Sequence, residues 1–408
     1  MRKLKAQYVF DGTQLHKLAT LVIKSGEIET ILHNETTEYA GEEFYNGILC
    51  PGFVNAHCHL ELSHYKNHIP HHTGLPEFVK QVVALRNSLS GEIEAMQAAD
   101  QEMQQNGIVA VGDISNTTIS FTTKQQSPIH YHTFVELLDL FNRNSREFER
   151  GKQLFASHFH SVPLSLSPHS PYTCSRTLIE RIALHAAEYE YPLSIHNQEC
   201  EAENELYRSN SGALYEQMFA ASRASATDAS RTSATGASTA TNEKRPFLKY
   251  GKSSLQTYST WLPQSSHILF VHNTHTSQAD IDFLKCNCSD LAYTFVVCPQ
   301  SNAYIAQEIP PLDLLLNNKL NVAIGTDSLA SNAALNIISE LFALQQAFSE
   351  ISLAQLLTCA TTNGARALGI HRKFGSFEKG KTPGVNLLEH IDFANMKLQK
   401  TTTVRQLM

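Results

Sequence analysis

The chain has 408 residues, of which 42% are hydrophobic, and its formal net charge at pH 7 is -7. This length is sufficient for one large domain and a smaller one. The negative charge and the lack of a Lys/Arg-rich run argue against a nucleic-acid partner, and no stretch reaches the roughly 18 apolar residues of a membrane span.

Both ends of the chain contain short strand-like runs separated by turn residues. Residues 1–47 lack the apolar core and cleavage site of a secretory signal, and residues 374–408 have the same strand-and-turn character. We expect residues 1–54 and 374–408 to form a small β-sandwich domain beside a larger domain of residues 55–373. The eight cysteines form no CxxC pair, which favours a reduced, cytoplasmic protein.

Between these ends, a short apolar run followed by a longer helix-compatible stretch recurs eight times. Near-continuous apolar runs predict strands of a parallel sheet that is covered on both faces. Helical patterns lie between them at 75–89, 92–106 and 176–190. This alternation predicts an α/β fold, a closed (β/α)8 barrel of the TIM type, with a doubly wound open sheet as the alternative. The predicted strand runs are 48–57, 107–115, 129–136, 162–169, 191–197, 266–273, 292–299 and 321–327.

Residues 221–244 differ from the rest of the chain in composition. They are rich in Ala, Ser and Thr and show no apolar periodicity. The segment lies between the fifth and sixth predicted strands, where a strand-to-helix loop of a barrel would be. We interpret it as a low-complexity, solvated insert, with a mobile lid over the site as the alternative.

Side chains that can bind a metal stand at the carboxyl ends of four predicted strands. His57 and His59 are two residues apart on the first strand, so both imidazoles face the same side. His196 ends the fifth strand, His272 the sixth and Asp327 the eighth. Active sites of such barrels lie at this end, so we expect the side chains to meet. Three imidazoles and a carboxylate, with an open position for water, suit one divalent ion, either Zn²⁺ or Fe²⁺.

The same strand ends supply groups for proton transfer. A metal ion lowers the pKa of its bound water, to about 7 in favourable zinc sites. Asp327 can accept a proton from that water, and Glu199, three residues after His196, is better placed to move protons than to bind the ion. His272 can polarise or orient the electrophile as negative charge develops.

Four runs, PGFVNAHCHLELSH, SIHNQE, FVHNTH and GTDSLASN, occur in this order and resemble the amidohydrolase superfamily across nearly the whole chain. The fourth predicted strand reads LSLSPHS, without the bridging lysine of binuclear members, so the resemblance implies one metal ion, most simply Zn²⁺. For individual residues it implies metal ligation by His57, His59, His196 and Asp327, proton transfer by Glu199, and a carbonyl- or water-directed role for His272.

The segment HLELS is similar to the aminodeoxyfutalosine deaminases, with S-adenosylhomocysteine and methylthioadenosine deaminases and chlorohydrolase-like enzymes as near relatives. This narrower resemblance implies substrate contacts for Glu61 and, in LSPHSPYTCS, for His169.

The implied function is a metal-dependent hydrolase of carbon–nitrogen bonds, a hydrolytic deaminase of a purine- or adenosine-type ring or a related aminated ring. Hydrolysis of an amide or ring carbon–halogen bond on the same scaffold is one alternative. A metal- or ligand-binding protein without catalysis is another. The expected partner is a small-molecule substrate, and a homodimer is one option for the oligomeric state.

Overall fold

The structure is a computed structural model, and it describes residues 1–33, 40–85, 90–139, 145–218, 249–263 and 267–408. The predicted insert at 221–244 and the last four residues of the predicted helix at 75–89 lie outside the described residues. Among the helices in the described ranges, none has the length and apolar character needed to cross a bilayer.

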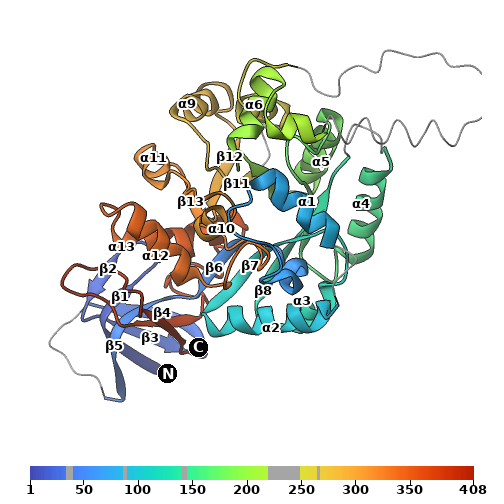
Figure 1. Cartoon of the computed structure of the whole chain (residues 1–408). Helices are drawn as coiled ribbons and strands as arrows, with labels where there is room; N and C mark the ends of the chain where they lie inside the picture. Colours follow the sequence, from blue (N-terminus) through green and yellow to red (C-terminus); the bar gives the residue numbers. More distant parts are fainter. Residues whose placement is uncertain (34–39, 86–89, 140–144, 219–248, 264–266) are drawn as a thin grey trace, which may run out of the picture.

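Eight parallel strands at the centre of the molecule form two four-stranded sheets (Figure 1). Seven of the eight predicted strand runs each coincide with one of these strands, and the first run covers one of them only in part. Within each sheet the strands are parallel, so their carboxyl ends lie at one edge. The first sheet consists of β6 (Phe53–Cys58), β7 (Ile108–Ser115), β8 (His130–Leu137) and β9 (Leu164–Pro168). The second consists of β10 (Leu193–Asn197), β11 (His267–His272), β12 (Ala292–Val297) and β13 (Val322–Ile324).

The two parallel sheets contact each other at both of their outer strands. A parallel bridge pairs Cys58, the last residue of β6, with Asp327, which follows β13. On the other side, the backbone N–H of His196 in β10 donates to the carbonyl oxygen of His169, just after β9, at 2.9 Å. Residues that are far apart in sequence are therefore neighbours at the carboxyl ends of the strands.

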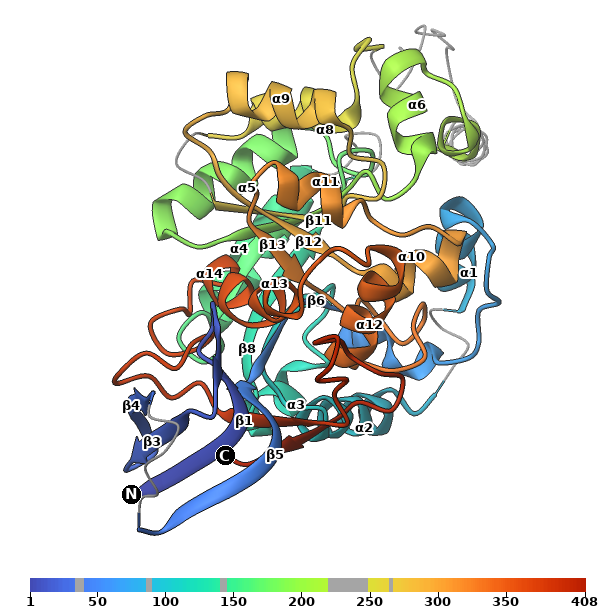
Figure 2. The same cartoon turned by 90° about the vertical axis from the view of Figure 1, so that its left-hand side faces the viewer.

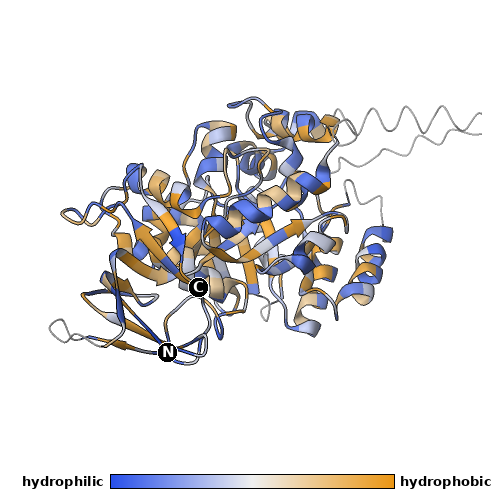
Figure 3. Cartoon of the chain, turned by 90° about the horizontal axis from the view of Figure 1, so that it is seen from below, coloured by the Kyte–Doolittle hydropathy of each residue, from blue (hydrophilic) through white to orange (hydrophobic). Residues whose placement is uncertain are grey.

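Helices surround the parallel strands in both views (Figures 1 and 2). Seen from below, the helices mix hydrophilic and hydrophobic residues, as expected for elements with one solvated face (Figure 3). Gly107, with φ of 74°, separates α2 from β7 in a left-handed conformation that suits glycine. The helices are α1 (Leu75–Leu85), α2 (Glu92–Gln105), α3 (Phe121–Gln126), α4 (Ser145–His158), α5 (Arg176–Tyr189), α6 (Glu201–Ser209), α8 (Ser254–Tyr258), α9 (Gln278–Asn287), α10 (Pro299–Ala306), α11 (Leu312–Asn317), α12 (Ile337–Ala347), α13 (Leu353–Thr358) and α14 (Gly364–Ala367).

Strands from both ends of the chain form a third sheet, which has seven strands and lies beside the parallel strands (Figures 1 and 2). Its order is β15–β14–β5–β1–β3–β4, with β2 paired to β1. Strands from the two ends therefore share one sheet, whereas a separate small β-sandwich domain stays a prediction. The strands are β1 (Arg2–Phe10), β2 (Leu15–Lys17), β3 (Thr20–Lys24), β4 (Glu27–Leu32), β5 (Glu42–Pro51), β14 (Val385–Glu389) and β15 (Thr403–Gln406).

The predicted first strand, residues 48–57, is in fact parts of two strands in different sheets. β5 ends at Pro51 in the terminal sheet, and β6 begins at Phe53 in the parallel sheet. At Gly52, between them, a Cβ atom would lie only 2.3 Å from a methyl carbon of Val109. The junction therefore requires glycine. The apolar run gives no sign of the change because both strands are buried.

Candidate metal centre

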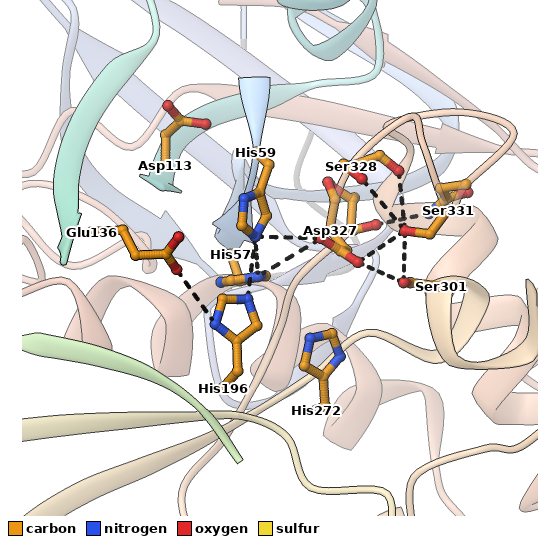
Figure 4. Close-up of polar contacts among 12 residues, drawn as sticks. His57, His59, Asp113, Glu136, His196, His272, Ser301, Asp327, Ser328 and Ser331 are labelled. Atoms are coloured by element: carbon orange, nitrogen blue, oxygen red, sulfur yellow. Dashed lines mark hydrogen bonds and ion pairs between the residues drawn. The ribbon is translucent and has the colours of Figure 1, made fainter. Parts of the chain in front are cut away.

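Three of the predicted imidazoles meet at the carboxyl ends of β6 and β10. The Nε2 atom of His59 lies 3.2 Å from Nε2 of His57 and 3.2 Å from Nε2 of His196. The Oδ1 atom of Asp327 lies 3.8 Å from Nε2 of His57 and 3.6 Å from Nε2 of His59. In Figure 4 the three rings and the carboxylate point toward one another. The structure thus brings four predicted site residues into one cluster.

The spacing within this cluster fits a tetrahedral metal site. With metal–ligand distances of about 2.0–2.1 Å, the ligand atoms of a tetrahedron are about 3.3–3.4 Å apart. The separations above lie on both sides of that value. Burial lowers the pKa of His57 and of His196, and neighbouring imidazoles lower both further. The nitrogens therefore keep the lone pairs that a metal ion requires.

Hydrogen bonds between the first and last parallel strands fix two members of the cluster. The carbonyl oxygen of His57 accepts the backbone N–H groups of Thr326, at 3.0 Å, and Asp327, at 3.1 Å. The Asn55 side chain accepts the N–H of Thr326 at 3.0 Å and donates to its Oγ1 at 2.8 Å. All four residues are buried. The position of His57 relative to Asp327 is therefore set by backbone contacts as well as by side chains.

Two serine hydroxyls orient the carboxylate of Asp327. Ser301 donates to Oδ2 at 2.6 Å and Ser331 donates to the same oxygen at 2.8 Å, which leaves Oδ1 on the side of the imidazoles (Figure 4). Burial raises the pKa of Asp327, but the nearby His59 and His272 imidazoles and the Ser301 hydrogen bond outweigh it, so the pKa lies below its usual value. The carboxylate is therefore charged. Sequence reasoning missed both serines, whose role depends on how the start of α10 and the loop after β13 meet.

A backbone hydrogen bond selects the tautomer of His196. Its Nδ1 lies 2.9 Å from the carbonyl oxygen of His169, an acceptor, so Nδ1 carries the proton and Nε2 keeps its lone pair. Oε1 of Glu136 is 3.6 Å from the same Nδ1, and its Oε2 accepts the side-chain N–H of Asn116 at 2.8 Å. The sequence analysis missed Glu136, although it ends the predicted strand at 129–136 and the strand-end rule applies to it as well.

Glu199 and His272 lie next to each other beside the cluster. Oε2 of Glu199 is 3.6 Å from Nε2 of His272, and both residues are buried. Burial, with smaller effects from Asp327 and Glu203, raises the pKa of Glu199 well above its usual value. A buried carboxyl whose pKa is raised suits a general acid.

Four non-glycine residues at the strand ends that carry this site have a left-handed backbone conformation. Gln198, His272, Asn273 and Asp327 have φ values of 46°, 75°, 62° and 57°. Residues with a Cβ atom rarely adopt this left-handed conformation, and such residues gather at functional sites. They lie at the carboxyl ends of β10, β11 and β13. His272 and Asp327, two residues of the site, are therefore held in conformations that cost local stability.

The two predicted substrate contacts lie at different distances from the cluster. The ring centroid of His169 is 4.9 Å from that of His196. Glu61 instead accepts hydrogen bonds from the backbone N–H groups of Asn116, at 3.1 Å, and Thr117, at 3.2 Å. Glu61 thus anchors the start of the loop after β7. Contact of either residue with substrate stays a prediction.

A buried ion pair that the sequence analysis did not identify lies behind the first strand. Asp113 in β7 and Lys124 in α3 form this pair, and both side chains are almost completely buried. Oδ1 of Asp113 also accepts the backbone N–H of Leu60 at 2.7 Å. Because Leu60 directly follows His59, the pair supports the backbone that carries this imidazole.

The substitution Lys124→Met is expected to destabilise the protein by about 3–5 kcal/mol, because it leaves the Asp113 carboxylate buried without its partner. Urea unfolding at a fixed zinc concentration measures the loss. The matched control is Lys80→Met, which removes an exposed ion pair with Glu77 and should change stability by less than about 1 kcal/mol. Equal unfolding midpoints for the two variants would contradict a structural role for the buried pair.

Sequence comparisons with known proteins identify a matching family and similar enzymes. Residues 48–407 match the amidohydrolase family. An adenosine deaminase from Helicobacter pylori is 26% identical over 352 residues, which cover 83% of this chain and 78% of that protein.

Solved structures with the same fold include two from bacteria. Helicobacter pylori aminofutalosine deaminase in complex with methylthio-coformycin superposes with a TM-score of 0.79 at 21% identity, covering 96% of this chain and 93% of that one. An adenosine deaminase from Xanthomonas campestris with bound zinc has a TM-score of 0.70 at 21% identity, covering 97% and 86%. Because the family match extends over residues 48–407, this chain belongs to the amidohydrolase family.

Proposed function

We propose that this chain is a metal-dependent hydrolase of carbon–nitrogen bonds that deaminates an aminated purine-type ring, with adenosine-type nucleosides as the substrate class. One observation carries the proposal. A cluster of three imidazoles and a carboxylate, spaced for one cation, lies beside Glu199, a buried carboxyl whose pKa is raised. The similarity to an adenosine deaminase supports the choice of substrate class.

The proposed metal ligands are His57, His59, His196 and Asp327. One Zn²⁺ ion fits the tetrahedral spacing, Fe²⁺ is the alternative, and the zinc in the Xanthomonas campestris neighbour favours zinc. The strand β9 and the residues after it read LSLSPHS and offer no lysine to bridge a second ion. When bound, the ion polarises a water molecule and lowers its pKa to about 7.

The neighbouring side chains then divide the proton transfers between them. Glu199 donates its proton to the ring nitrogen next to the carbon that water attacks, and so makes that carbon electrophilic. Oδ1 of Asp327 accepts a proton from the water, because Oδ2 already accepts two hydroxyl hydrogen bonds. His272 orients the attack from its position 3.6 Å from Glu199. The ring C–NH₂ group and water become a ring carbonyl and ammonia.

The architecture that holds this site is also part of the proposal. We infer that the eight parallel strands close into one barrel, which the β6–β13 bridge and the His169–His196 backbone hydrogen bond support. Residues 1–54 with 374–408 form a small domain beside residues 55–373, with the terminal strands as part of a β-sandwich. Substrate contacts by Glu61 and His169, a homodimer, a cytoplasmic location and the lack of a nucleic-acid partner stay predictions.

A release assay with the zinc-loaded protein tests the proposed reaction. We expect ammonia from at least one of adenosine, methylthioadenosine, S-adenosylhomocysteine and aminodeoxyfutalosine, and a much lower rate from free adenine. Chelation should stop the release, and added zinc should restore it. Parallel arms measure chloride from a chlorinated triazine and product from a simple amide. Ammonia from no substrate, with turnover in either other arm, would replace deamination by that reaction.

A further inference from the structure

Helix α12 carries a carboxyl on its buried face. Glu340 is fully buried, as are Ile337, Leu341 and Leu344 on the same helix. An apolar residue would fill this position without the cost of removing a carboxyl from water. That cost appears in the pKa of Glu340, which burial raises to about 8. Core packing alone therefore does not explain a glutamate here.

The two oxygens of Glu340 join two separate segments. Oε2 accepts the backbone N–H of Gln300 at 2.9 Å, and Oε1 accepts the side-chain N–H of Asn332 at 2.7 Å. Gln300 is the second residue of α10, where backbone N–H groups have no partner within the helix. The same Asn332 nitrogen donates to the carbonyl oxygen of Thr326 at 2.9 Å, next to Asp327.

Each segment that Glu340 holds carries one of the serines that orient Asp327. Ser301 follows Gln300, and Ser331 precedes Asn332. Besides their bonds to Oδ2 of Asp327, the two hydroxyls lie 2.8 Å from each other. The two serines can meet at one oxygen only if the start of α10 and the loop after β13 keep a fixed distance.

We propose that Glu340 is a positioning residue of the metal centre, which holds the two serine-bearing segments together so that Oδ1 of Asp327 faces the imidazoles. Glu340 touches none of the four proposed ligands, and it acts on the site through Ser301 and Ser331 and through the contact of Asn332 with Thr326. The proposal rests on the proposed metal centre. It adds that zinc binding requires Glu340, a residue that does not contact the ligands.

The substitution Glu340→Gln tests it. The glutamine amide has only one oxygen, so it can accept from only one of the two donors, the Gln300 N–H or the Asn332 amide. Its NH₂ group then faces the other donor, and that hydrogen bond is lost. We expect zinc affinity, measured by competition with a chromogenic chelator, to fall by about 10–100-fold, the effect typical of residues that support metal ligands. The kcat should fall and KM stay within about twofold. The control is Glu350→Gln, an exposed glutamate just after α12.

A double-mutant cycle separates positioning from general stabilisation. In the background of Ser301→Ala with Ser331→Ala, Glu340→Gln should add a clearly smaller loss of zinc affinity than it causes in the wild-type chain, because the serine path to Asp327 is removed and only the Asn332–Thr326 contact remains. Additive losses would overturn the proposal. So would a lower unfolding temperature with unchanged zinc affinity.

If Glu340→Gln does not fold, Asn332→Leu removes the donor at the other end of the same hydrogen bond. Unchanged zinc affinity in that variant would also refute the proposal. Zinc affinity is measured without substrate, so a chain that binds zinc but releases no ammonia refutes the proposed reaction and leaves this inference standing. A wild-type chain that binds no zinc refutes the metal centre and this inference together.

Discussion

The substitution Glu199→Gln is expected to reduce turnover by roughly 10²–10⁴-fold while zinc stays bound, because the new amide has no proton to give to the ring nitrogen. Glu199 is buried, and burial raises the pKa of its carboxyl, which favours the protonated form that a general acid needs. Glutamine has almost the same volume and leaves the four proposed ligands in place. The loss should therefore appear in kcat and not in zinc content.

Single-turnover kinetics with the best substrate of the release assay would measure this loss. The matched control is Glu201→Gln, two residues further along the chain, whose carboxylate is exposed and pairs with Arg208. It should keep wild-type kcat. Near-normal turnover in Glu199→Gln at equal zinc content would remove Glu199 from the mechanism and assign the proton donation to another group.

Much of this site could be predicted because parallel strands impose a simple rule on the sequence. Each strand is a short apolar run, and the residues that end it lie at the same edge of the sheet. His57, His196, His272 and Asp327 all occupy such positions, and the structure gathers them. Reading the rule at every strand would also have found Glu136, which stands in the same position on β8.

The residues that support the cluster could not be predicted in the same way. Asp113 lies within an apolar strand and pairs with Lys124 from a later helix, so its role depends on packing between elements. Ser301 and Ser331 become partners only because the start of α10 and the loop after β13 meet at Asp327. No local sequence pattern predicts a contact between segments that are distant in the chain. The division of 48–57 into two strands at Gly52 could not be predicted either. Both strands are buried there, so the apolar run continues although the strands belong to different sheets.

The substitution His57→Ala is expected to remove zinc from the protein and with it all measurable turnover. His57 is completely buried, and its Nε2 lies within 3.8 Å of the His59 and Asp327 ligand atoms. Alanine supplies no donor atom, and the carbonyl hydrogen bonds of residue 57 hold the backbone in place. The loss of affinity should exceed the about 10–100-fold that follows removal of a supporting residue. Elemental analysis after dialysis measures the remaining zinc.

The control for this variant is His68→Ala, an exposed histidine on the segment after the first strand. It should bind zinc as the wild-type chain does, and a clear loss of zinc there would instead indicate a site among the histidines of that segment. A fully occupied site in His57→Ala would contradict ligation by His57.

Thermal unfolding gives a second readout of His57→Ala that does not depend on turnover. A ligand that binds only the folded state stabilises it by RT ln(1 + [L]/Kd), which is about 2.7 kcal/mol when free zinc is 100 times Kd. Added zinc should therefore raise the unfolding temperature of the wild-type chain and of His68→Ala. In His57→Ala the rise should vanish, because the folded state has lost one of its four ligands. An equal zinc-dependent rise of the unfolding temperature in all three proteins would mean that zinc stabilises the fold from another position. The cluster of His57, His59, His196 and Asp327 would then not be the zinc site.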